Sequence, residues 1–258
     1  MFENLVEVLK ANPRKIVYTE GTDARILESA ARLKQGGFLT PILVGNVDDV
    51  KAAAKAGSFD IEGLEIIDPA NYDKMDEMAQ CMFDLRKGKM TMEEVRANLQ
   101  KGNYFGTMLV VLGYADGLVS GACHSTADTL RPALQILKTA PGTKLVSAFF
   151  VMCTDTPQFG TDGTLIFADC GLNINPSSDE LSEIAIASAH SWSTFMGNVE
   201  PHVAMLSYST GNSGKGADVD VVKEATRIAK EKAPELMLEG PLQYDAAIDP
   251  TVAKTKLP

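Results

Sequence analysis

The stretch KIVYTEGTDARILESAARLKQGGFLTPILV, residues 15–44, decides the fold class of this chain. Its first residues, 15–19, form an apolar run that predicts a buried strand closed by Glu20. Residues 23–35 then repeat apolar side chains at helical spacing, and residues 41–44 predict a second strand. A strand, a helix and a further strand in this order are typical of a parallel sheet.

The same alternation continues through the first half of the chain. We expect a helix over 47–56, a strand over 64–67, a helix over 73–87 and a short strand over 117–121, with two more helical stretches before Leu112. The fold class predicted from this order is α/β, with a parallel sheet that carries helices on both faces. Ligands of such sheets bind beyond the carboxyl ends of the strands.

The pattern changes after residue 142, and this change places a domain boundary. The first α/β domain is expected to span residues 1–143 and the second residues 144–258. In the second domain, strands over 144–151 and 164–168 joined by a polar loop predict an antiparallel hairpin. The elements expected after it are a helix over 178–196 that starts at a capping box, a strand over 202–207, a glycine-rich loop and a helix over 217–232.

Composition and charge exclude several classes of protein. The chain has 258 residues, a hydrophobic fraction of 45 % and a formal net charge of −10, with a pI of about 4.8. Such an acidic surface repels nucleic acid and anionic membranes, and no apolar run approaches the ~18 residues of a membrane span. The amphipathic N-terminal stretch lacks the features of a signal peptide. We therefore expect a cytoplasmic protein with no nucleic-acid or membrane partner.

Cysteine and histidine spacing indicates no metal site. His124 stands next to Cys123, but adjacent side chains rarely face each other as a nucleophile and its base must. His190 and His202 show no ligand spacing either. The sequence therefore implies no metal and no bound cofactor. The cysteines are far apart and are expected to be reduced thiols: Cys81, Cys123, Cys153 and Cys170.

The strongest chemical signal is SGACHSTADTLRP, residues 120–132. A strand ends, a loop of small and hydroxyl residues follows, and a helix begins. Proline is tolerated in the first turn of a helix, so Pro132 predicts a helix start near Asp128 or Thr129. The free N–H groups and the dipole at such a start favour an anion.

The side chains of this stretch suit a phosphate group. Arg131 adds a guanidinium that can bind phosphate through two hydrogen bonds. Ser125 and Thr129 add hydroxyl donors. An ordinary strand–helix loop with a surface arginine is the alternative, because helix N-termini are common. The residues alone leave both interpretations open.

A second loop, SYSTGNSGKG at residues 207–216, also follows a strand and precedes a helix. This position favours phosphate binding, although the loop is not a P-loop, because Gly216 follows Lys215 where a serine or threonine is required. A GxGxxG dinucleotide motif is absent as well. A flexible glycine turn is the alternative here.

The loop at 120–133 resembles the signature loop of the phosphate acetyl/butyryltransferases. The resemblance extends from about residue 14 to the end of the sequence, and several separated motifs agree with it. The further motifs are similar in order and spacing to that family: Asp162-Gly163-Thr164, Ala168-Asp169-Cys170-Gly171 and Met205-Leu206-Ser207-Tyr208-Ser209-Thr210.

The resemblance implies a fold and a reaction. The fold would be the two-domain architecture of the isocitrate/isopropylmalate dehydrogenases, with a cleft between two α/β domains. The reaction would transfer an acetyl group between acetyl phosphate and coenzyme A, by direct attack of the thiolate while both substrates are bound. Coenzyme A is a substrate rather than a cofactor, and the resemblance also implies a homodimer.

The resemblance also implies roles for particular residues. Arg131 would hold the phosphoryl group of acetyl phosphate, and Arg86 would hold a phosphate of coenzyme A. For Arg86, the alternative is a helix-end cation favoured by the dipole. The other residues implied at the phosphate site are Ser120, Gly121, Ser125 and Thr129 from the first loop, and Tyr208, Ser209 and Lys215 from the second.

The catalytic residues of the family have no match in this sequence. The family uses an aspartate as base and a serine–arginine pair near its carboxyl end, and we expect these beyond Pro258. The second domain is therefore expected to be incomplete, and no catalytic residue is certain in this chain. Asp162 and Asp169 belong to motifs with structural or binding roles. Alternatives are a phosphate butyryltransferase and an inactive ligand-binding fragment of the family. A dehydrogenase of the isocitrate type would need metal-binding aspartates and an arginine cluster, which the sequence does not show.

Overall fold

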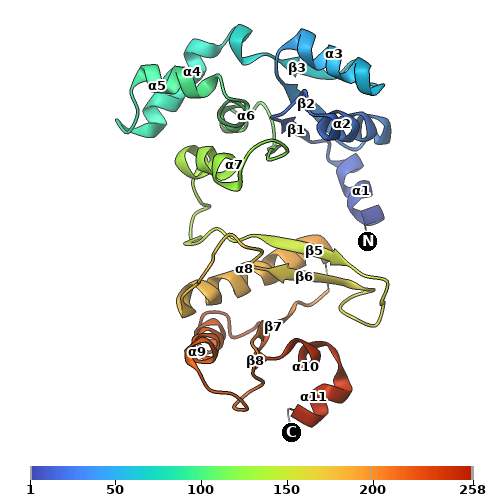
Figure 1. Cartoon of the computed structure of the whole chain (residues 1–258), viewed down its shortest axis with the longest axis vertical. Coiled ribbons are helices and arrows are strands. Elements are labelled where there is room, and N and C mark those ends of the chain that lie inside the picture. Colours follow the sequence, from blue (N-terminus) through green and yellow to red (C-terminus); the bar gives the residue numbers. More distant parts are fainter. Residues whose placement is uncertain (1, 198, 257–258) are drawn as a thin grey trace. The chain divides into compact units, whose positions relative to one another are not determined.

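The computed structural model describes residues 2–197 and 199–256. The chain divides into two compact units, Met1–Lys138 and Thr139–Pro258, and each contains its own strands and helices (Figure 1). Within the described residues, no helix is both long and apolar enough to cross a membrane.

The first unit is built on a four-stranded parallel sheet in the order β3-β2-β1-β4. The two central strands pair with Val17 opposite Ile42, and the edge strand places Leu118 beside Val17. The predicted parallel α/β arrangement is confirmed for this unit. The strands are β1 (Lys15–Tyr18), β2 (Thr40–Val44), β3 (Glu65–Ile67) and β4 (Gly117–Val119).

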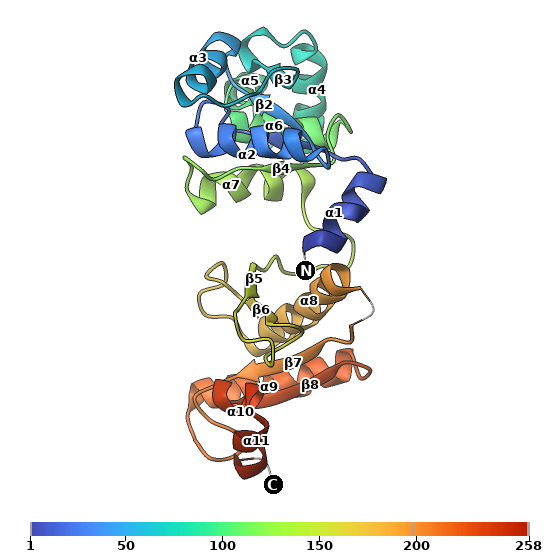
Figure 2. The ribbon, with the colours of Figure 1, turned by 90° about the vertical axis from the view of Figure 1, so that its right-hand side faces the viewer.

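Helices cover both faces of this sheet, as predicted (Figure 2). Alternate strand residues point to opposite faces, so Tyr18 and Leu43 pack with α2 and α3 while Val17 and Ile42 pack with α4, α5 and α6. The helices of the unit are α1 (Phe2–Ala11), α2 (Ala24–Gly36), α3 (Val47–Gly57), α4 (Met75–Arg86), α5 (Met92–Leu99), α6 (Gly102–Val111) and α7 (Thr126–Pro132), with the short turns η1 (Pro69–Asn71) and η2 (Ala133–Leu137).

Side-chain caps fix where these helices begin. Asp23 accepts a hydrogen bond from the backbone N–H of Arg25 and starts α2, and Asn46 does the same for the first turn of α3. Each cap satisfies backbone donors that the first turn of a helix leaves free. The predicted starts of these two helices are confirmed within a residue.

The second unit combines an antiparallel hairpin with a parallel strand pair. The hairpin is confirmed, and so are the helix starting at the Ser177–Glu180 capping box and the helix over 217–232. A small core lies between α8, α9 and the parallel pair, around Met205 and Leu238. The elements are β5 (Phe149–Cys153), β6 (Thr164–Ala168), α8 (Ser178–Met196), β7 (His202–Leu206), α9 (Ala217–Lys232), β8 (Met237–Leu242), α10 (Tyr244–Ile248) and α11 (Pro250–Lys256).

The strand predicted over 144–151 is wrong at its start, because β5 begins at Phe149. Side chains from the segment after β6 form hydrogen bonds with the backbone just before β5. Asp169 accepts from the N–H of Ala148, and Asn173 donates to the carbonyl of Val146. These backbone groups therefore have partners outside a strand ladder. Three further elements, β8, α10 and α11, were not predicted from the sequence.

Candidate anion-binding site

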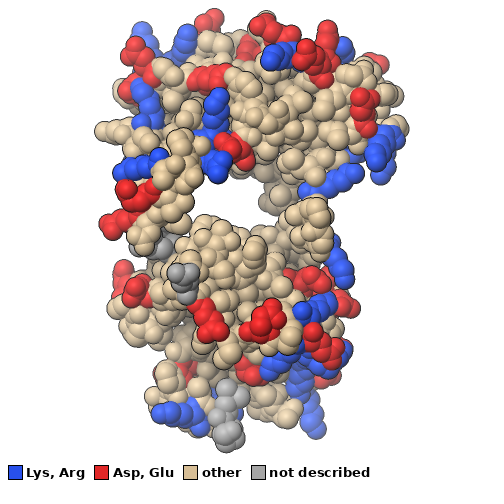
Figure 3. Space-filling model, turned by 180° about the vertical axis from the view of Figure 1, so that it is seen from behind, with Lys and Arg blue, Asp and Glu red and all other residues tan. Residues whose placement is uncertain are grey.

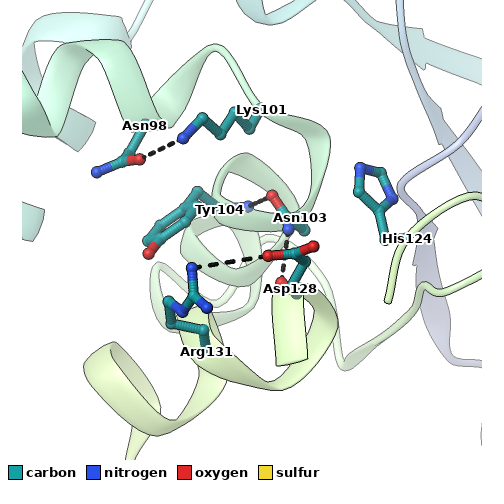
Figure 4. A pocket seen from close by; sticks show the side chains of 7 residues that line it. All are labelled: Asn98, Lys101, Asn103, Tyr104, His124, Asp128 and Arg131. Atoms are coloured by element: carbon teal, nitrogen blue, oxygen red, sulfur yellow. Dashed lines mark hydrogen bonds and ion pairs between the residues drawn. The ribbon is translucent and has the colours of Figure 1, made fainter. Parts of the chain in front are cut away.

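A pocket of about 290 Å³ lies in the first unit, at the carboxyl end of the parallel strands (Figure 4). The end of α5, the start of α6, the loop after β4 and helix α7 build its walls. Its lining residues are Asn98, Lys101, Asn103, Tyr104, His124, Asp128 and Arg131. The predicted signature loop thus supplies one side, and the α5–α6 side was not predicted.

Helix α7 starts earlier than predicted. Ser125 is its N-cap: the Ser125 hydroxyl accepts from the N–H of Asp128 at 3.2 Å and donates to the Asp128 carboxylate at 2.7 Å. The helix therefore begins at Thr126, and the predicted start near Asp128 or Thr129 is wrong. The rule about proline misled the prediction, since Pro132 ends the helix instead of opening it.

Asn103 explains how α7 accommodates this proline. In an α-helix the carbonyl of Asp128 would accept from the N–H of residue 132, which proline lacks. The side-chain amide of Asn103, at the start of α6, donates to that carbonyl at 2.6 Å instead. Asn103 is 4 % exposed, so its bond is shielded from water. The amide therefore joins α6 to α7 and holds one wall of the pocket.

Two cations face the pocket. Arg131 is 56 % exposed, and its Nη1 lies 3.6 Å from an oxygen of Asp128. This is a loose, solvated ion pair that competes weakly for the guanidinium. Lys101 donates to the side chain of Asn98 at 2.9 Å and stands over the ring of Tyr104, with 5.9 Å between its Nζ and the ring centroid. Both cations remain available to an anion.

Glu20 holds the loop that leads into α7, and sequence reasoning missed this role. The carboxylate is 5 % exposed, and its Oε1 accepts from the N–H of Gly121 at 2.9 Å, the N–H of Cys123 at 3.1 Å and Nδ1 of His124 at 2.8 Å. Burial alone would raise the pKa of Glu20, but these hydrogen bonds outweigh it and the pKa is lowered. The one signal in the sequence was an acid at the end of a buried strand.

A second cluster fixes the same loop from α2. Arg25 grips Asp23 through two nitrogens, at 2.9 and 2.8 Å, and also donates to the carbonyl of Ala122 at 2.6 Å. The thiol of Cys123 donates to Asp23 at 3.2 Å. That hydrogen bond, together with the nearby negative charges of Asp23 and Glu20, raises the pKa of Cys123. The arrangement disfavours the thiolate that a nucleophile needs.

Two predicted hydroxyls are buried without a partner among the described residues: those of Ser120 and Thr129. Gly121 follows Ser120 in the loop after β4 and has a φ of 109°, which favours glycine. A Cβ at Gly121 would stand 3.4 Å from the Thr129 hydroxyl. Buried hydroxyls without partners are uncommon because each costs free energy. Neither Ser120 nor Thr129 is among the residues that line the pocket.

Arg86 lies in the last turn of α4, as predicted. Its Nη1 donates to the carbonyl of Gln135 in η2 at 2.6 Å, and its buried Nε has no partner among the described residues. Tyr104 donates to the side chain of the same Gln135 at 2.9 Å. The arginine therefore has a structural contact within the first unit.

The second predicted loop connects β7 to α9 in the second unit. Ser209 is 1 % exposed, and its hydroxyl accepts from the N–H of Gly214 at 2.7 Å, so it stabilises the loop itself. Tyr208 and Lys215 are exposed. Gly216 has a φ of 149°, and a Cβ there would stand 2.6 Å from the Tyr208 hydroxyl. Any side chain at 216 would displace that tyrosine.

Asp169 serves the loop after β6. Its carboxylate accepts from the backbone N–H of Ala148, Leu172 and Asn173 and from the Asn173 amide. Burial would raise the pKa of Asp169, but these hydrogen bonds together lower it. Asp162 lies in the hairpin loop with a φ of 50°. The Asp169 carboxylate is thus committed to structural hydrogen bonds.

The wider surface carries charges of both signs. On the face shown in Figure 3, lysine and arginine side chains are interspersed with aspartate and glutamate over both units. The two cations at the pocket are therefore a local feature of an acidic protein, whose formal net charge is −10. A local grouping of this kind can attract an anion without making the whole surface basic.

Comparisons with known proteins agree with the sequence motifs. The model of the family described as phosphate acetyl/butaryl transferase matches residues 1–258. A phosphate acetyltransferase from Acetivibrio thermocellus is 48 % identical over 255 residues, which cover 98 % of this chain and 76 % of that protein. One from Bacillus subtilis is 47 % identical over 258 residues, covering 100 % of this chain and 77 % of that protein.

Solved structures agree as well. A phosphotransacetylase from Streptococcus pyogenes superposes with a TM-score of 0.90 at 44 % identity, covering 100 % of this chain and 76 % of that one. A branched-chain phosphotransacylase from Enterococcus faecalis superposes with a TM-score of 0.64 at 17 % identity, covering 95 % of this chain and 74 % of that one. The second likeness concerns the fold alone.

Proposed function

Because this chain belongs to the phosphate acetyl/butaryl transferase family, we propose that it transfers an acetyl group between acetyl phosphate and coenzyme A. The observation that carries the proposal is a pocket with two available cations, built by the loop whose sequence is the family signature. The relatives at 48 % and 47 % identity are named phosphate acetyltransferases, which favours acetyl over butyryl as the transferred group.

The pocket is proposed to bind the phosphoryl group. The Arg131 guanidinium matches two phosphoryl oxygens, and Lys101 adds a second positive charge across the pocket. Ser120 and Thr129, which the family resemblance assigns to the phosphate site, have buried hydroxyls behind the loop. Gly121 and Ser125 shape the loop and cap the helix that carries Arg131.

The chemistry is acyl transfer without a covalent enzyme intermediate. The thiol of coenzyme A gives its proton to a base, and the resulting thiolate attacks the carbonyl carbon of acetyl phosphate. The bond from that carbon to the phosphate oxygen then breaks. Phosphate departs with the electron pair and stays paired with Arg131. The raised pKa of Cys123 argues against an acyl-cysteine in this pocket. Holding both substrates together is sufficient to bring the reacting atoms into contact.

The remaining family features are proposed for this chain on the same basis. Arg86 is assigned to a phosphate of coenzyme A. Tyr208, Ser209 and Lys215, on the loop between β7 and α9 of the second unit, are assigned to substrate binding. We also propose the two-domain dehydrogenase-like arrangement and a homodimer of cytoplasmic location. Light scattering on the purified chain measures the oligomeric state directly.

The test of the function is an assay for acetyl-CoA formed from acetyl phosphate and coenzyme A, with butyryl phosphate in parallel. We expect acetyl transfer to exceed butyryl transfer. A folded chain that binds acetyl phosphate but forms no acetyl-CoA would favour the alternative, a ligand-binding member of the family without catalysis. Faster transfer of butyryl than of acetyl would reverse the substrate assignment.

A further inference from the structure

The imidazole of His124 lines the pocket from the side opposite Arg131, across Asp128 (Figure 4). Its Nδ1 lies 2.8 Å from Oε1 of Glu20. An ionised carboxylate can only accept a hydrogen bond, so the ring nitrogen must carry the proton. This contact fixes both the orientation of the ring and the nitrogen that holds its hydrogen.

The other ring nitrogen, Nε2, is then the one left for a ligand. Among the described residues it has no hydrogen-bond partner, and the His124 side chain is 35 % exposed. In the neutral ring Nε2 accepts a hydrogen bond, and in the charged ring it donates one. A phosphoryl group can match either state, because its oxygens accept when ionised and donate when protonated.

Glu20 itself is held in place from several directions. The same Oε1 that faces His124 accepts from the N–H groups of Gly121 and Cys123, and Oε2 accepts from the Thr19 hydroxyl at 3.3 Å. The carboxylate lies at the end of β1, in the buried part of the sheet. Such support leaves little freedom for the ring to turn, which is the condition for a preorganised contact.

The charged groups around the ring come from three helices. Asp23 and Arg25 pair with each other at the start of α2, so they offset one another. Lys101 precedes α6, and Asp128 and Arg131 belong to α7. An anion in the pocket would meet Lys101 and Arg131 as cations, while Asp128 already accepts from Ser125.

We infer that His124 is a further phosphoryl-binding residue, which contacts a phosphoryl oxygen through Nε2, and that Glu20 is its positioning residue. The inference rests on the proposed function and names two residues that the sequence analysis did not assign to ligand binding. It requires that Glu20 act through His124 and not only through the backbone of the loop. The alternative is a pair that merely ties the loop to β1.

The experiment measures binding of inorganic phosphate to the full chain, by calorimetry and by nitrogen NMR of its histidine rings. The variants are His124→Gln, Glu20→Gln and the matched control His190→Gln, whose histidine lies exposed on α8. We expect the first two to weaken phosphate binding by about tenfold, the loss of one hydrogen bond to a charged group. The control should bind as the unchanged chain does.

The NMR signal separates positioning from simple loop support. In the unchanged chain, phosphate should shift the Nε2 resonance of His124, and Nδ1 should be protonated before phosphate is added. In Glu20→Gln, the side-chain amide can donate as well as accept, so the hydrogen of the His124 ring should no longer be held on Nδ1 alone. Circular dichroism should show that this variant is still folded. If Glu20 and His124 only connect the loop to β1, phosphate should leave the Nε2 resonance of His124 unchanged.

The outcomes also separate this inference from the proposed function. If phosphate binds, and Arg131→Ala weakens it while His124→Gln and Glu20→Gln do not, the inference is overturned and the acetyl-transfer proposal stands. If phosphate binds through His124 but no acetyl-CoA forms in the activity assay, the inference stands and the proposed function fails. A chain that binds no phosphate overturns both.

Discussion

Arg131 is exposed and loosely paired, a combination that leaves its charge available to a ligand. Arg131→Ala should lower kcat/KM for acetyl phosphate by an amount equivalent to about 2–3 kcal/mol, because a charged hydrogen bond in the transition state is lost. Steady-state kinetics with each substrate varied in turn measures this. Arg131→Lys keeps the charge and should retain part of the activity. Unchanged kinetics for acetyl phosphate in the alanine variant would contradict the phosphoryl assignment.

Arg86 combines a proposed ligand role with an observed contact to Gln135. If it recognises a phosphate of coenzyme A, Arg86→Ala should raise KM for coenzyme A more than KM for dephospho-coenzyme A. The same variant should also lower the melting temperature slightly, because the contact to η2 is lost. Equal changes in both KM values would contradict the phosphate role of Arg86 and leave it only the structural contact with Gln135.

Glu20 makes the stability of the first unit depend on pH. Its pKa in the folded chain lies below the ordinary value of 4.5, so its hydrogen bonds stabilise the fold fully above that value. This stabilisation is lost as pH falls through the folded-state pKa. We expect the difference in unfolding free energy between the unchanged chain and Glu20→Gln to be constant near neutral pH and to shrink below about pH 4.5. Denaturation curves at several pH values measure it, and a difference independent of pH would refute the linkage.

At the scale of elements, the join between α6 and α7 depends on one amide. Asn103→Ala should cost about 1–3 kcal/mol of unfolding free energy, because the carbonyl of Asp128 loses its donor in a buried position. Pro132→Ala restores a backbone N–H four residues after that carbonyl. In the double variant the helix can satisfy its own carbonyl, so the cost of removing Asn103 should fall.

A double-mutant cycle in chemical denaturant tests this coupling. Strictly additive effects of the two substitutions would show that the amide and the proline act independently. Asn98→Ala is the matched control: this residue also lines the pocket but makes no contact with the Asp128 carbonyl.

Elements with local signals were predictable, and elements set by distant partners were not. Helix α8 was correct to the residue because Ser177 and Glu180 form a capping box within one turn. The predicted start of β5 was wrong because the carboxylate of Asp169, some twenty residues later, accepts a hydrogen bond from the backbone just before the strand. In the site, Arg131 was found from its motif. Glu20 was missed because its partners lie about a hundred residues away, and no spacing rule reaches that far.

At the scale of the whole molecule, the two units differ in how much core they bury. The first unit has large buried side chains on both faces of its sheet, such as Met82 and Phe105. The core of the second is built largely from alanines around Met205. Since buried apolar area drives folding, we expect two unfolding transitions, with the second unit unfolding first.

Hydrogen exchange with mass spectrometry at increasing denaturant measures both transitions. Met82→Ala should lower only the later transition and Met205→Ala only the earlier one, by about 2–5 kcal/mol for a fully buried side chain. Phosphate at a hundred times its dissociation constant should add about 2.7 kcal/mol to the first unit alone. A single transition that both variants shift equally would show that the chain unfolds as one body.

The contact between Cys123 and Asp23 has a consequence for the durability of the protein. Cys123 is exposed on the loop beside the pocket, where oxidants and electrophiles can reach it. The carboxylate keeps its thiol protonated, and protonated thiols react slowly with both kinds of reagent. The Asp23 carboxylate at the start of α2 therefore lowers the reactivity of this thiol. A cysteine can stand beside the pocket without being readily oxidised under oxidative stress.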